Sequence, residues 1–324
     1  MGNARIGIVG AGVMGRSHAD TFNTRIAGAS LIAISDPDVA RAEEAAQGRD
    51  IEIFPDALRL IEHPQIDAVV VVSPDERHEE QVAACLAAGK PVLCEKPLSP
   101  TSVACRRLVE LEQSSGRRLI QVGYMRRFDA AYLDLKAAYD SGAVGDARIV
   151  KCAHRNASAP IFFRGGMAIS NAMVHEFDIL RWLLDAEIAR VRVDQPGREG
   201  ERLDDPVLAT LEMSSGQLVS IEVFMNAVYG YDIRTEIVGE SGVLRMGGPA
   251  ITHRLSSTEP GVRFSVDFTV RFRDAYILQM QAWVDSIASG NPVGASATDG
   301  LRATVAAEAA ARALKSGRWE MVEA

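Results

Sequence analysis

The feature of this sequence that most constrains its fold is the regular alternation of short apolar runs with helix-like segments over residues 1–122. Apolar strands without in–out alternation belong to a sheet that is covered on both faces. A helix between successive strands makes that sheet parallel, with right-handed crossovers. We therefore expect a doubly wound parallel α/β domain over these residues. The expected strands are residues 5–9, 31–35, 68–72, 92–94 and 119–122, and the expected helices include residues 41–47, 79–88 and 103–112.

A glycine-rich segment, Gly10-Ala11-Gly12-Val13-Met14-Gly15, follows the first expected strand and opens a helix. In this context the G-x-G-x-x-G pattern is typical of a dinucleotide-binding turn. The first glycine permits the tight turn, the second lets the backbone approach a pyrophosphate, and the third lets helix and strand pack closely. The N-terminus of the helix attracts the phosphates through its N–H groups and its dipole. The sequence thus predicts a Rossmann domain.

An acidic residue, Asp36, follows the second expected strand. A carboxylate at this place accepts hydrogen bonds from a ribose 2′-OH and repels a 2′-phosphate, which favours NAD over NADP. Arg41 would soften that preference, but its spacing puts it inside the following helix. The alternative interpretation is a plain glycine turn and a surface aspartate that begins an Asp-Pro loop.

The second half of the chain has a different rhythm. Apolar and polar residues alternate over residues 207–213, Ser215-Gly216 predicts a turn, and a return strand places Val219, Ile221 and Val223 on one face. Residues 264–270 repeat the alternation. Strict period-two alternation indicates antiparallel strands with one face on a core.

Helices are expected to flank this second sheet. Residues 274–289 carry an apolar stripe, and Asp299 is the expected N-cap of a last, alanine-rich helix. We expect residues 123–324 to form an α/β domain with a large, mostly antiparallel open sheet that binds the substrate. Its moderately polar open face would join subunits into a homo-oligomer.

Composition excludes several classes of function. The net charge of −8 argues against a nucleic-acid or membrane partner, because neither surface attracts an acidic protein. The four cysteines (Cys85, Cys94, Cys105 and Cys152) lack C-x-x-C or metal-ligand spacing, so we expect buried thiols, a reducing compartment and no metal site. No signal peptide is recognisable, and the longest strongly apolar run, residues 68–72, is too short to cross a bilayer. These features predict a cytoplasmic protein.

Two further segments carry groups suited to chemistry. Lys96, in Cys94-Glu95-Lys96-Pro97, follows an expected parallel strand, where ligands bind in such sheets. Asn171, His175 and Asp178 have the spacing of one face of a helix over residues 170–184. Alternatively, the lysine is a solvated surface charge and the histidine of a capped helix faces water.

Several separated motifs, in order, give the chain a resemblance to the glucose–fructose oxidoreductase/inositol dehydrogenase/MocA (Gfo/Idh/MocA) family over nearly its whole length. Three of them resemble the inositol 2-dehydrogenase branch in particular: Met125-Arg126-Arg127-Phe128-Asp129, His154-Arg155-Asn156 and Tyr229-Gly230-Tyr231-Asp232. The others are the glycine loop, Glu95-Lys96-Pro97, Val174-His175-Glu176-Phe177-Asp178 and residues 238–240.

The resemblance implies a Rossmann domain followed by an open-sheet α/β domain, assembled as dimers or tetramers, and NAD(P)-linked oxidation of a CH–OH group. It implies that Lys96 contacts the hydroxyl being oxidised and that His175 is the general base. An imidazole suits the role of base, because the hydride leaves only as the hydroxyl loses its proton. The residues implied in the polyol pocket are Arg126, His154, Asn156 and Tyr231. Those expected at the cofactor are Gly10, Gly12, Val13, Met14, Gly15, Asp36, Ser73, Glu95 and Lys96.

One position departs from the family pattern, because Asn171 stands where the family usually has an aspartate. An amide hydrogen-bonds a hydroxyl or an imidazole but does not stabilise an imidazolium by charge. This allows either slower oxidation of the same inositol or recognition of a different hydroxyl pattern. The alternatives are therefore a dehydrogenase of another pyranose or modified sugar, and a non-catalytic NAD- or sugar-sensing protein.

Overall fold

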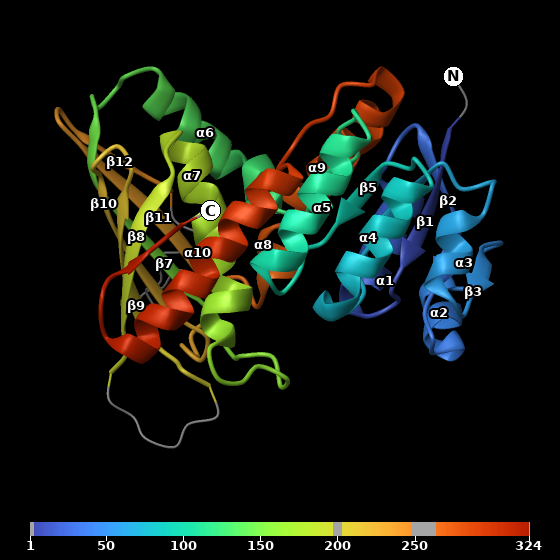
Figure 1. Cartoon of the computed structure of the whole chain (residues 1–324), viewed down its shortest axis with the longest axis horizontal. Helices are drawn as coiled ribbons and strands as arrows, with labels where there is room; N and C mark the ends of the chain where they lie inside the picture. Colours follow the sequence, from blue (N-terminus) through green and yellow to red (C-terminus); the bar gives the residue numbers. More distant parts are fainter. Residues whose placement is uncertain (1–2, 197–202, 248–263, 324) are drawn as a thin grey trace, which may run out of the picture. The chain divides into compact units, whose positions relative to one another are not determined.

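The chain divides into two units in the computed structural model, which describes residues 3–196, 203–247 and 264–323 (Figure 1). Unit 1 comprises Met1–Met125 with Tyr276–Thr304, and unit 2 comprises Arg126–Ala275 with Val305–Ala324. Residues 276–304, which the sequence had grouped with the second domain, thus cluster with unit 1. We propose below that unit 1 binds the cofactor and that unit 2 binds the substrate.

The sheet of unit 1 has the strand order β3-β2-β1-β4-β5-β6, and every pairing in it is parallel. This is the doubly wound order, with its switch point between β1 and β4, and it confirms the predicted fold. The strand β3, which is short and lies at the edge of the sheet, was not predicted. The strands are β1 Ala4–Val9, β2 Ala29–Ser35, β3 Glu52–Phe54, β4 Ala68–Val71, β5 Val92–Cys94 and β6 Ile120–Val122.

Helices cover both faces of this sheet, since all the residues of β4, β5 and β6 are buried. Their bounds are α1 Val13–Thr24, α2 Val39–Ala46, α3 Ala57–Glu62, the 3₁₀ turn η1 Asp75–Arg77, α4 His78–Ala87 and α5 Ser102–Ser114. The predicted helix over residues 274–289 is confirmed as α9, Arg273–Ser289. The helix α10, Ala297–Ser316, begins in unit 1 and ends in unit 2.

Unit 2 holds a seven-stranded sheet in the order β12-β11-β7-β10-β9-β8-β13. Within the described strands of this second sheet only β7 and β10 pair in parallel, which confirms a mostly antiparallel sheet. The hairpin of β9 and β10 turns at residues 214–217 as predicted, with Gly216 at φ +92°. The strands are β7 Ala147–Arg155, β8 Ile188–Asp194, β9 Val207–Met213, β10 Leu218–Phe224, β11 Asp232–Gly239, β12 Val243–Arg245 and β13 Glu320–Met321.

The helices of unit 2 gather on one side of its sheet, as the ribbons of α6 and α7 show (Figure 1). Burial alternates along β9 in agreement, because Val207, Ala209, Leu211 and Met213 are buried while Leu208 is exposed. The remaining elements are the 3₁₀ turn η2 Met125–Phe128, α6 Ala130–Asp140, the π-helical turn η3 Ala168–Met173, α7 Val174–Leu184 and α8 Phe268–Arg271.

The strand predicted over residues 264–270 is wrong. Ser265 makes an isolated bridge with Tyr231, and the chain then turns into the short helix α8. The side chain of Asp267 caps this helix by accepting hydrogen bonds from the backbone N–H groups of Thr269 and Val270, at 2.9 and 3.1 Å. The alternation of apolar residues was real, but an N-cap outweighs it over so few residues.

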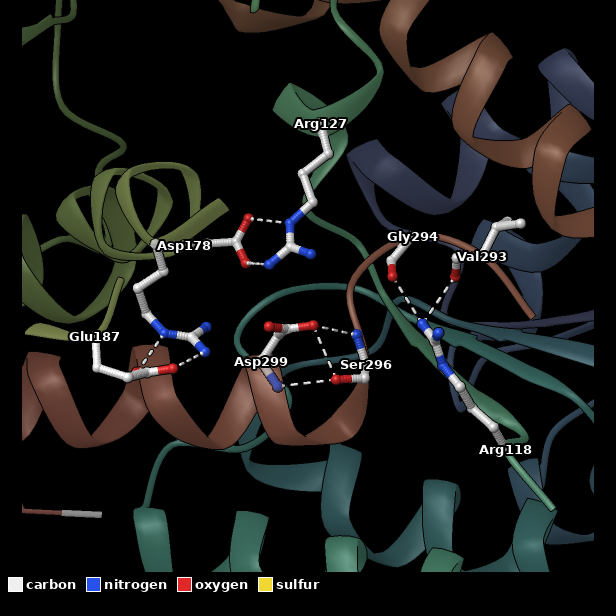
Figure 2. A network of polar contacts seen from close by, with 9 residues as sticks. Arg118, Arg127, Asp178, Glu187, Val293, Gly294, Ser296 and Asp299 are labelled. Carbon is white, nitrogen blue, oxygen red and sulfur yellow. Dashed lines mark hydrogen bonds and ion pairs between the residues drawn. The ribbon is translucent and has the colours of Figure 1, made fainter. Parts of the chain in front are cut away.

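The expected N-cap of α10 is also corrected. Ser296 precedes the helix, and its Oγ accepts from the backbone N–H of Asp299 at 3.1 Å. The Asp299 carboxylate in turn accepts from the N–H and hydroxyl of Ser296, both at 2.8 Å (Figure 2). This reciprocal pair is a capping box, in which Asp299 takes the third helical position and Ser296 the cap.

Neither a membrane-spanning segment nor a reactive thiol is found in the described part of the chain. None of its helices has the length and apolar character that a bilayer span requires. All four cysteines are buried and unbridged. Burial raises the pKa of Cys85 and Cys152 to about 12, so these thiols stay protonated at neutral pH.

We expect Ser296→Ala to lower the free energy of unfolding by about 1 kcal/mol, because it removes the cap of α10. Urea unfolding followed by circular dichroism measures the change. Ser114→Ala is the control, since this exposed hydroxyl donates to the carbonyl oxygen of Glu110 within its own helix, α5. Equal stability of the two variants would show that the capping box contributes nothing.

Candidate active site

The glycine loop of unit 1 has a geometry that only glycine permits at two positions. Gly10 has φ +102°, and a Cβ there would lie 2.7 Å from the carbonyl oxygen of Val72. A Cβ on Gly15 would lie 2.0 Å from the carbonyl oxygen of Gly10, inside the turn. At Gly12, by contrast, an added Cβ would meet no atom within 4 Å, so the space before the start of α1 is open.

Asp36, which directly follows β2, is hydrogen-bonded to this loop. Its Oδ2 accepts a hydrogen bond from the backbone N–H of Ala11 at 2.8 Å, and its Oδ1 accepts from the N–H of Asp38 at 2.9 Å. The interpretation as a surface aspartate is wrong, because Asp36 is buried. Each carboxylate oxygen keeps a second lone pair for a ribose hydroxyl. Arg41 lies in α2 as expected, yet its Nη1 comes within 3.8 Å of Asp36 Oδ1.

Ser73 and Lys96 follow β4 and β5, at the carboxyl ends of two adjacent parallel strands. Ser73 Oγ donates to Gln81 Oε1 at 2.6 Å, and its backbone stands directly against Gly10. Lys96 is half-buried, so it is not simply a solvated surface charge. Its neighbour Glu95 is buried, with one oxygen on His18 and the other on the N–H of Lys96.

These residues fit a dinucleotide. The open space at Gly12 lies where a pyrophosphate approaches the backbone, at the N-terminus of a twelve-residue helix. Val13 and Met14 form the first turn of that helix, and the side chain of Val13 is 66% exposed. The start of α1 could therefore hold the phosphates, and the Asp36 carboxylate could accept from a ribose hydroxyl.

In unit 2, the rings of His154, His175 and Tyr231 lie close together. The ring of His154, on β7, lies 6.3 Å from that of His175 on α7 and 5.9 Å from that of Tyr231, as measured between centroids. All three side chains are buried, so the interpretation of His175 as a solvent-facing residue is wrong. Burial raises the pKa of Tyr231 to about 12, which leaves its phenol protonated and able to donate.

A buried ion pair supports this cluster. Arg126, only 1% exposed, donates from Nη1 to Glu176 Oε1 and approaches His154 Nδ1 with Nη2 at 3.1 Å. Glu176 Oε2 lies 3.1 Å from the same His154 nitrogen. Burial would raise the pKa of Glu176, but Arg126 and His154 hold it below its ordinary value. The Glu176 carboxylate is therefore ionised, and the positive charge of Arg126 neutralises it.

Glu176 was not among the residues expected at the site. It follows His175 in a helix whose other charged residues are Asp178 and Arg181, and it is 1% exposed. A carboxylate in such a segment is the signal that could have identified it, because a buried charge requires a partner. The partner, Arg126, was predicted to line the pocket; the structure places it behind His154 and in cation–π range of Phe272, at 5.8 Å.

The predicted alignment on one face of an α-helix does not hold at Asn171, although His175 and Asp178 both lie in α7. Asn171 lies in the π-helical turn η3 and α7 begins only at Val174, so α-helical spacing does not relate Asn171 to His175. Asp178 is fully buried and accepts from Arg127 Nε and Nη2 at 2.9 and 2.5 Å (Figure 2). A π-turn inside a helix is often found at a functional site.

Asn156 follows β7, two residues beyond His154. Its backbone N–H donates to the carbonyl oxygen of Phe224 at 2.9 Å, and its carbonyl oxygen accepts from Ala227 at 2.8 Å. The side-chain Oδ1 is buried and has no hydrogen-bond partner among residues 3–196, 203–247 and 264–323. An acceptor in this state matches a hydroxyl ligand, because a buried acceptor without a partner is costly.

Comparisons with known proteins agree with this geometry. Residues 4–124 match the oxidoreductase family with an NAD-binding Rossmann fold, and residues 132–245 match the GFO/IDH/MocA C-terminal domain. The chain is 48% identical to inositol 2-dehydrogenase 1 of Saccharopolyspora erythraea, with 98% of this chain and 96% of that protein covered. It is 41% identical to inositol 2-dehydrogenase of Pseudomonas fluorescens, with 97% and 95% covered.

Two solved structures are similar over almost the whole chain. The complex of myo-inositol dehydrogenase from Lactobacillus casei with NAD(H) and myo-inositol has a TM-score of 0.95 at 33% identity, and covers 99% of this chain and 97% of that one. Scyllo-inositol dehydrogenase from the same organism, with NAD(H) and scyllo-inositol, has a TM-score of 0.91 at 28% identity and covers 99% of both chains.

We expect Arg126→Met to lower the free energy of unfolding by about 3–5 kcal/mol, because it leaves the Glu176 carboxylate buried without its partner. Adding Glu176→Gln should restore part of that loss, as urea unfolding would measure. The control is Asp140→Asn, which removes an exposed pair with Lys136 worth only about 0.3–0.5 kcal/mol. A loss of similar size in the control would refute this ranking.

The same pair predicts a dependence on pH. The pKa of Glu176 is lower in the folded chain than its ordinary value. Its contribution to stability is therefore present at neutral pH and is lost as the pH falls through the folded pKa. Unfolding measured from neutral to acid pH should show a smaller acid loss in Glu176→Gln than in the wild type. An unchanged acid slope would contradict the assignment.

Proposed function

The chain belongs to the GFO/IDH/MocA oxidoreductase family, and on that premise we propose that its substrate is an inositol, oxidised at one secondary hydroxyl. It is an NAD-dependent dehydrogenase that acts on CH–OH groups of cyclic polyols. The observation that carries the substrate proposal is the buried cluster of His154, His175 and Tyr231, in a chain that resembles inositol dehydrogenases over its full length.

Proton removal is the step that this chain's own residues must perform. Bound NAD would accept the hydride, and the hydroxyl must lose its proton as that hydride leaves. His175 is the proposed base, because an imidazole takes up a proton near neutral pH and its ring lies in the polar cluster. Lys96 is proposed to contact the same hydroxyl, where its ammonium stabilises the developing alkoxide.

The cofactor would be held by unit 1. Gly10, Gly12, Val13, Met14 and Gly15 would surround the pyrophosphate, and Asp36 would accept from the ribose. Ser73, Glu95 and Lys96 stand at the carboxyl ends of β4 and β5, where parallel sheets bind their ligands. The support for this placement is the open space at Gly12 and the tie between Asp36 and the glycine loop.

The remaining hydroxyls of the ring need hydrogen-bond partners, since an unmatched one would be costly to bury. Tyr231 supplies a phenol donor, Asn156 an amide and His154 an imidazole edge. Arg126 lies deeper, and we propose that it orients His154 and Tyr231 in the pocket wall. Asn171 takes the place of a carboxylate, so the chain either oxidises inositol more slowly or prefers another hydroxyl pattern.

We also propose that the open face of the second sheet joins subunits. The side chains of Ile149, Leu208 and Leu218 are exposed on strands whose alternate residues are buried. Exposed apolar residues on an open sheet are typical of a surface that another copy covers. Sedimentation at several concentrations would distinguish a homo-oligomer from a monomer.

We expect NAD-dependent turnover of myo-inositol or scyllo-inositol in an absorbance assay of NADH formation, run beside a panel of pyranoses. Lys96→Ala should abolish turnover and leave NAD binding intact, because it removes the charge at the reacting oxygen. Asn171→Asp should raise turnover if the amide only slows the reaction, and should change the preferred polyol if it selects the substrate. Full activity in Lys96→Ala would refute the mechanism.

Asp36→Ser should shift cofactor preference towards NADP. The substitution removes the carboxylate that repels a 2′-phosphate and leaves Arg41, now 3.8 Å from that carboxylate, to attract it. Comparing kcat/KM for the two cofactors measures the shift, which should be about tenfold or more. Asp36→Ser/Arg41→Ala is the matched control and should lose most of the gain for NADP. An unaltered cofactor ratio would show that Asp36 does not read the ribose.

A further inference from the structure

The turn that carries Lys96 is held on both sides by buried histidines, neither of which the proposed mechanism uses. His18, on α1, contacts Glu95, the residue before the lysine. His78, at the start of α4, contacts Pro97, the residue after it. His18 is 0% and His78 1% exposed, so solvent does not compete for either contact.

His18 and Glu95 form a chain of hydrogen bonds that ends at the lysine backbone. His18 Nε2 lies 3.0 Å from Glu95 Oε1, and Glu95 Oε2 accepts from the N–H of Lys96 at 3.3 Å. A carboxylate only accepts, so the hydrogen of the first contact lies on His18 Nε2. One carboxylate thereby connects the helix of the glycine loop with the turn of the reacting lysine.

The side chains of Glu95 and His18 are closely packed by Gly123 and Tyr276. A Cβ on Gly123 would lie 2.9 Å from both the carboxyl carbon and Oε2 of Glu95, so only glycine leaves room for this carboxylate. The ring of Tyr276, on α9, covers the His18 ring with centroids 5.7 Å apart. Both partners are therefore confined by packing as well as by their hydrogen bond.

His78 anchors the other side of the turn. Its Nδ1 lies 2.8 Å from the carbonyl oxygen of Pro97, and its Nε2 lies 3.0 Å from that of Ser73. Ser73 stands against Gly10, so this bridge also leads from the glycine loop to the lysine turn. The two histidines thus reach the turn from α1 and from the segment after β4.

We propose that His18, through Glu95, is a positioning residue that fixes Lys96 with respect to the nucleotide loop; this rests on the proposed role of Lys96. A buried carboxylate–imidazole pair adds little to stability compared with apolar side chains of similar size. Its effect on rate is larger, since a shift of about 1 Å in a reacting group lowers turnover by about 100-fold. In this proposal His18 acts on Lys96 only through Glu95.

The test compares two substitutions of His18. His18→Leu removes the donor and keeps an apolar side chain in the same space. His18→Gln places an amide nitrogen where Nε2 stands, so it keeps the bond to Glu95. His63→Leu is the matched control, because this histidine of unit 1 packs on Phe54 at a ring distance of 5.5 Å, far along the chain from the lysine turn.

We expect His18→Leu to lower kcat by about 10- to 100-fold while KM for NAD changes by less than about threefold. His18→Gln should recover most of the lost kcat, and His63→Leu should match the wild type. Wild-type kcat in His18→Leu, equal losses in the Leu and Gln variants, or a loss of NAD affinity as large as that of kcat would overturn the proposal.

A second measurement does not depend on activity. The amide of Lys96 is protected by Glu95, so its hydrogen exchange should become faster in His18→Leu and stay slow in His18→Gln. Unchanged exchange in His18→Leu would overturn the positioning role even if the polyol panel identified no substrate. Absence of turnover by the wild type would refute the proposed substrate instead. If His18→Leu does not fold, His18→Asn, whose shorter amide does not reach Glu95, replaces it.

Discussion

The fold of the first unit depends on the absence of a side chain at Gly10 and Gly15. Because a side chain at either position would collide with backbone atoms, α1 starts almost in contact with the turn after β1 and with Val72 after β4. That close approach brings the carboxyl ends of β1 and β4 together at the switch point of the sheet. Asp36 then adds a side-chain hydrogen bond to the same loop, which connects the end of β2 with the start of α1.

The second unit depends on charge balance. Arg126 and Glu176 are both 1% exposed, and each would be prohibitively costly to bury alone. Placed together, they give His154 a fixed partner on Nδ1 and keep net charge out of the wall behind the aromatic cluster. Asp178 and Arg127 form a second buried ion pair two residues further along α7. The helix that carries His175 is thus held through its acidic residues as well as its apolar ones.

The features that could be predicted from the sequence are those that depend on a local pattern of residues. Continuous β-branched runs identified the strands of the parallel sheet except β3, and the glycine spacing identified the glycine loop. The errors arose where one hydrogen bond outweighs a pattern: Asp267 turned an alternating segment into α8, and Ser296 took the cap assigned to Asp299. The pairing of Glu176 with Arg126 is a tertiary effect, because it connects segments fifty residues apart, and the π-helical turn before α7 departs from the α-helical spacing that the prediction assumed. No spacing rule reports them.

The donors and acceptors of the aromatic cluster explain how it could read a ring of hydroxyls. Tyr231, whose pKa burial raises to about 12, is a phenol donor at neutral pH. Asn156 presents both an acceptor and donors. His154 Nδ1 lies 3.1 Å from both an Arg126 donor and a Glu176 acceptor, so either tautomer has a partner there. Its Nε2 can therefore donate or accept without loss of the buried bond. A hydroxyl also does both, so a cluster of this kind can match neighbouring hydroxyls of differing orientation.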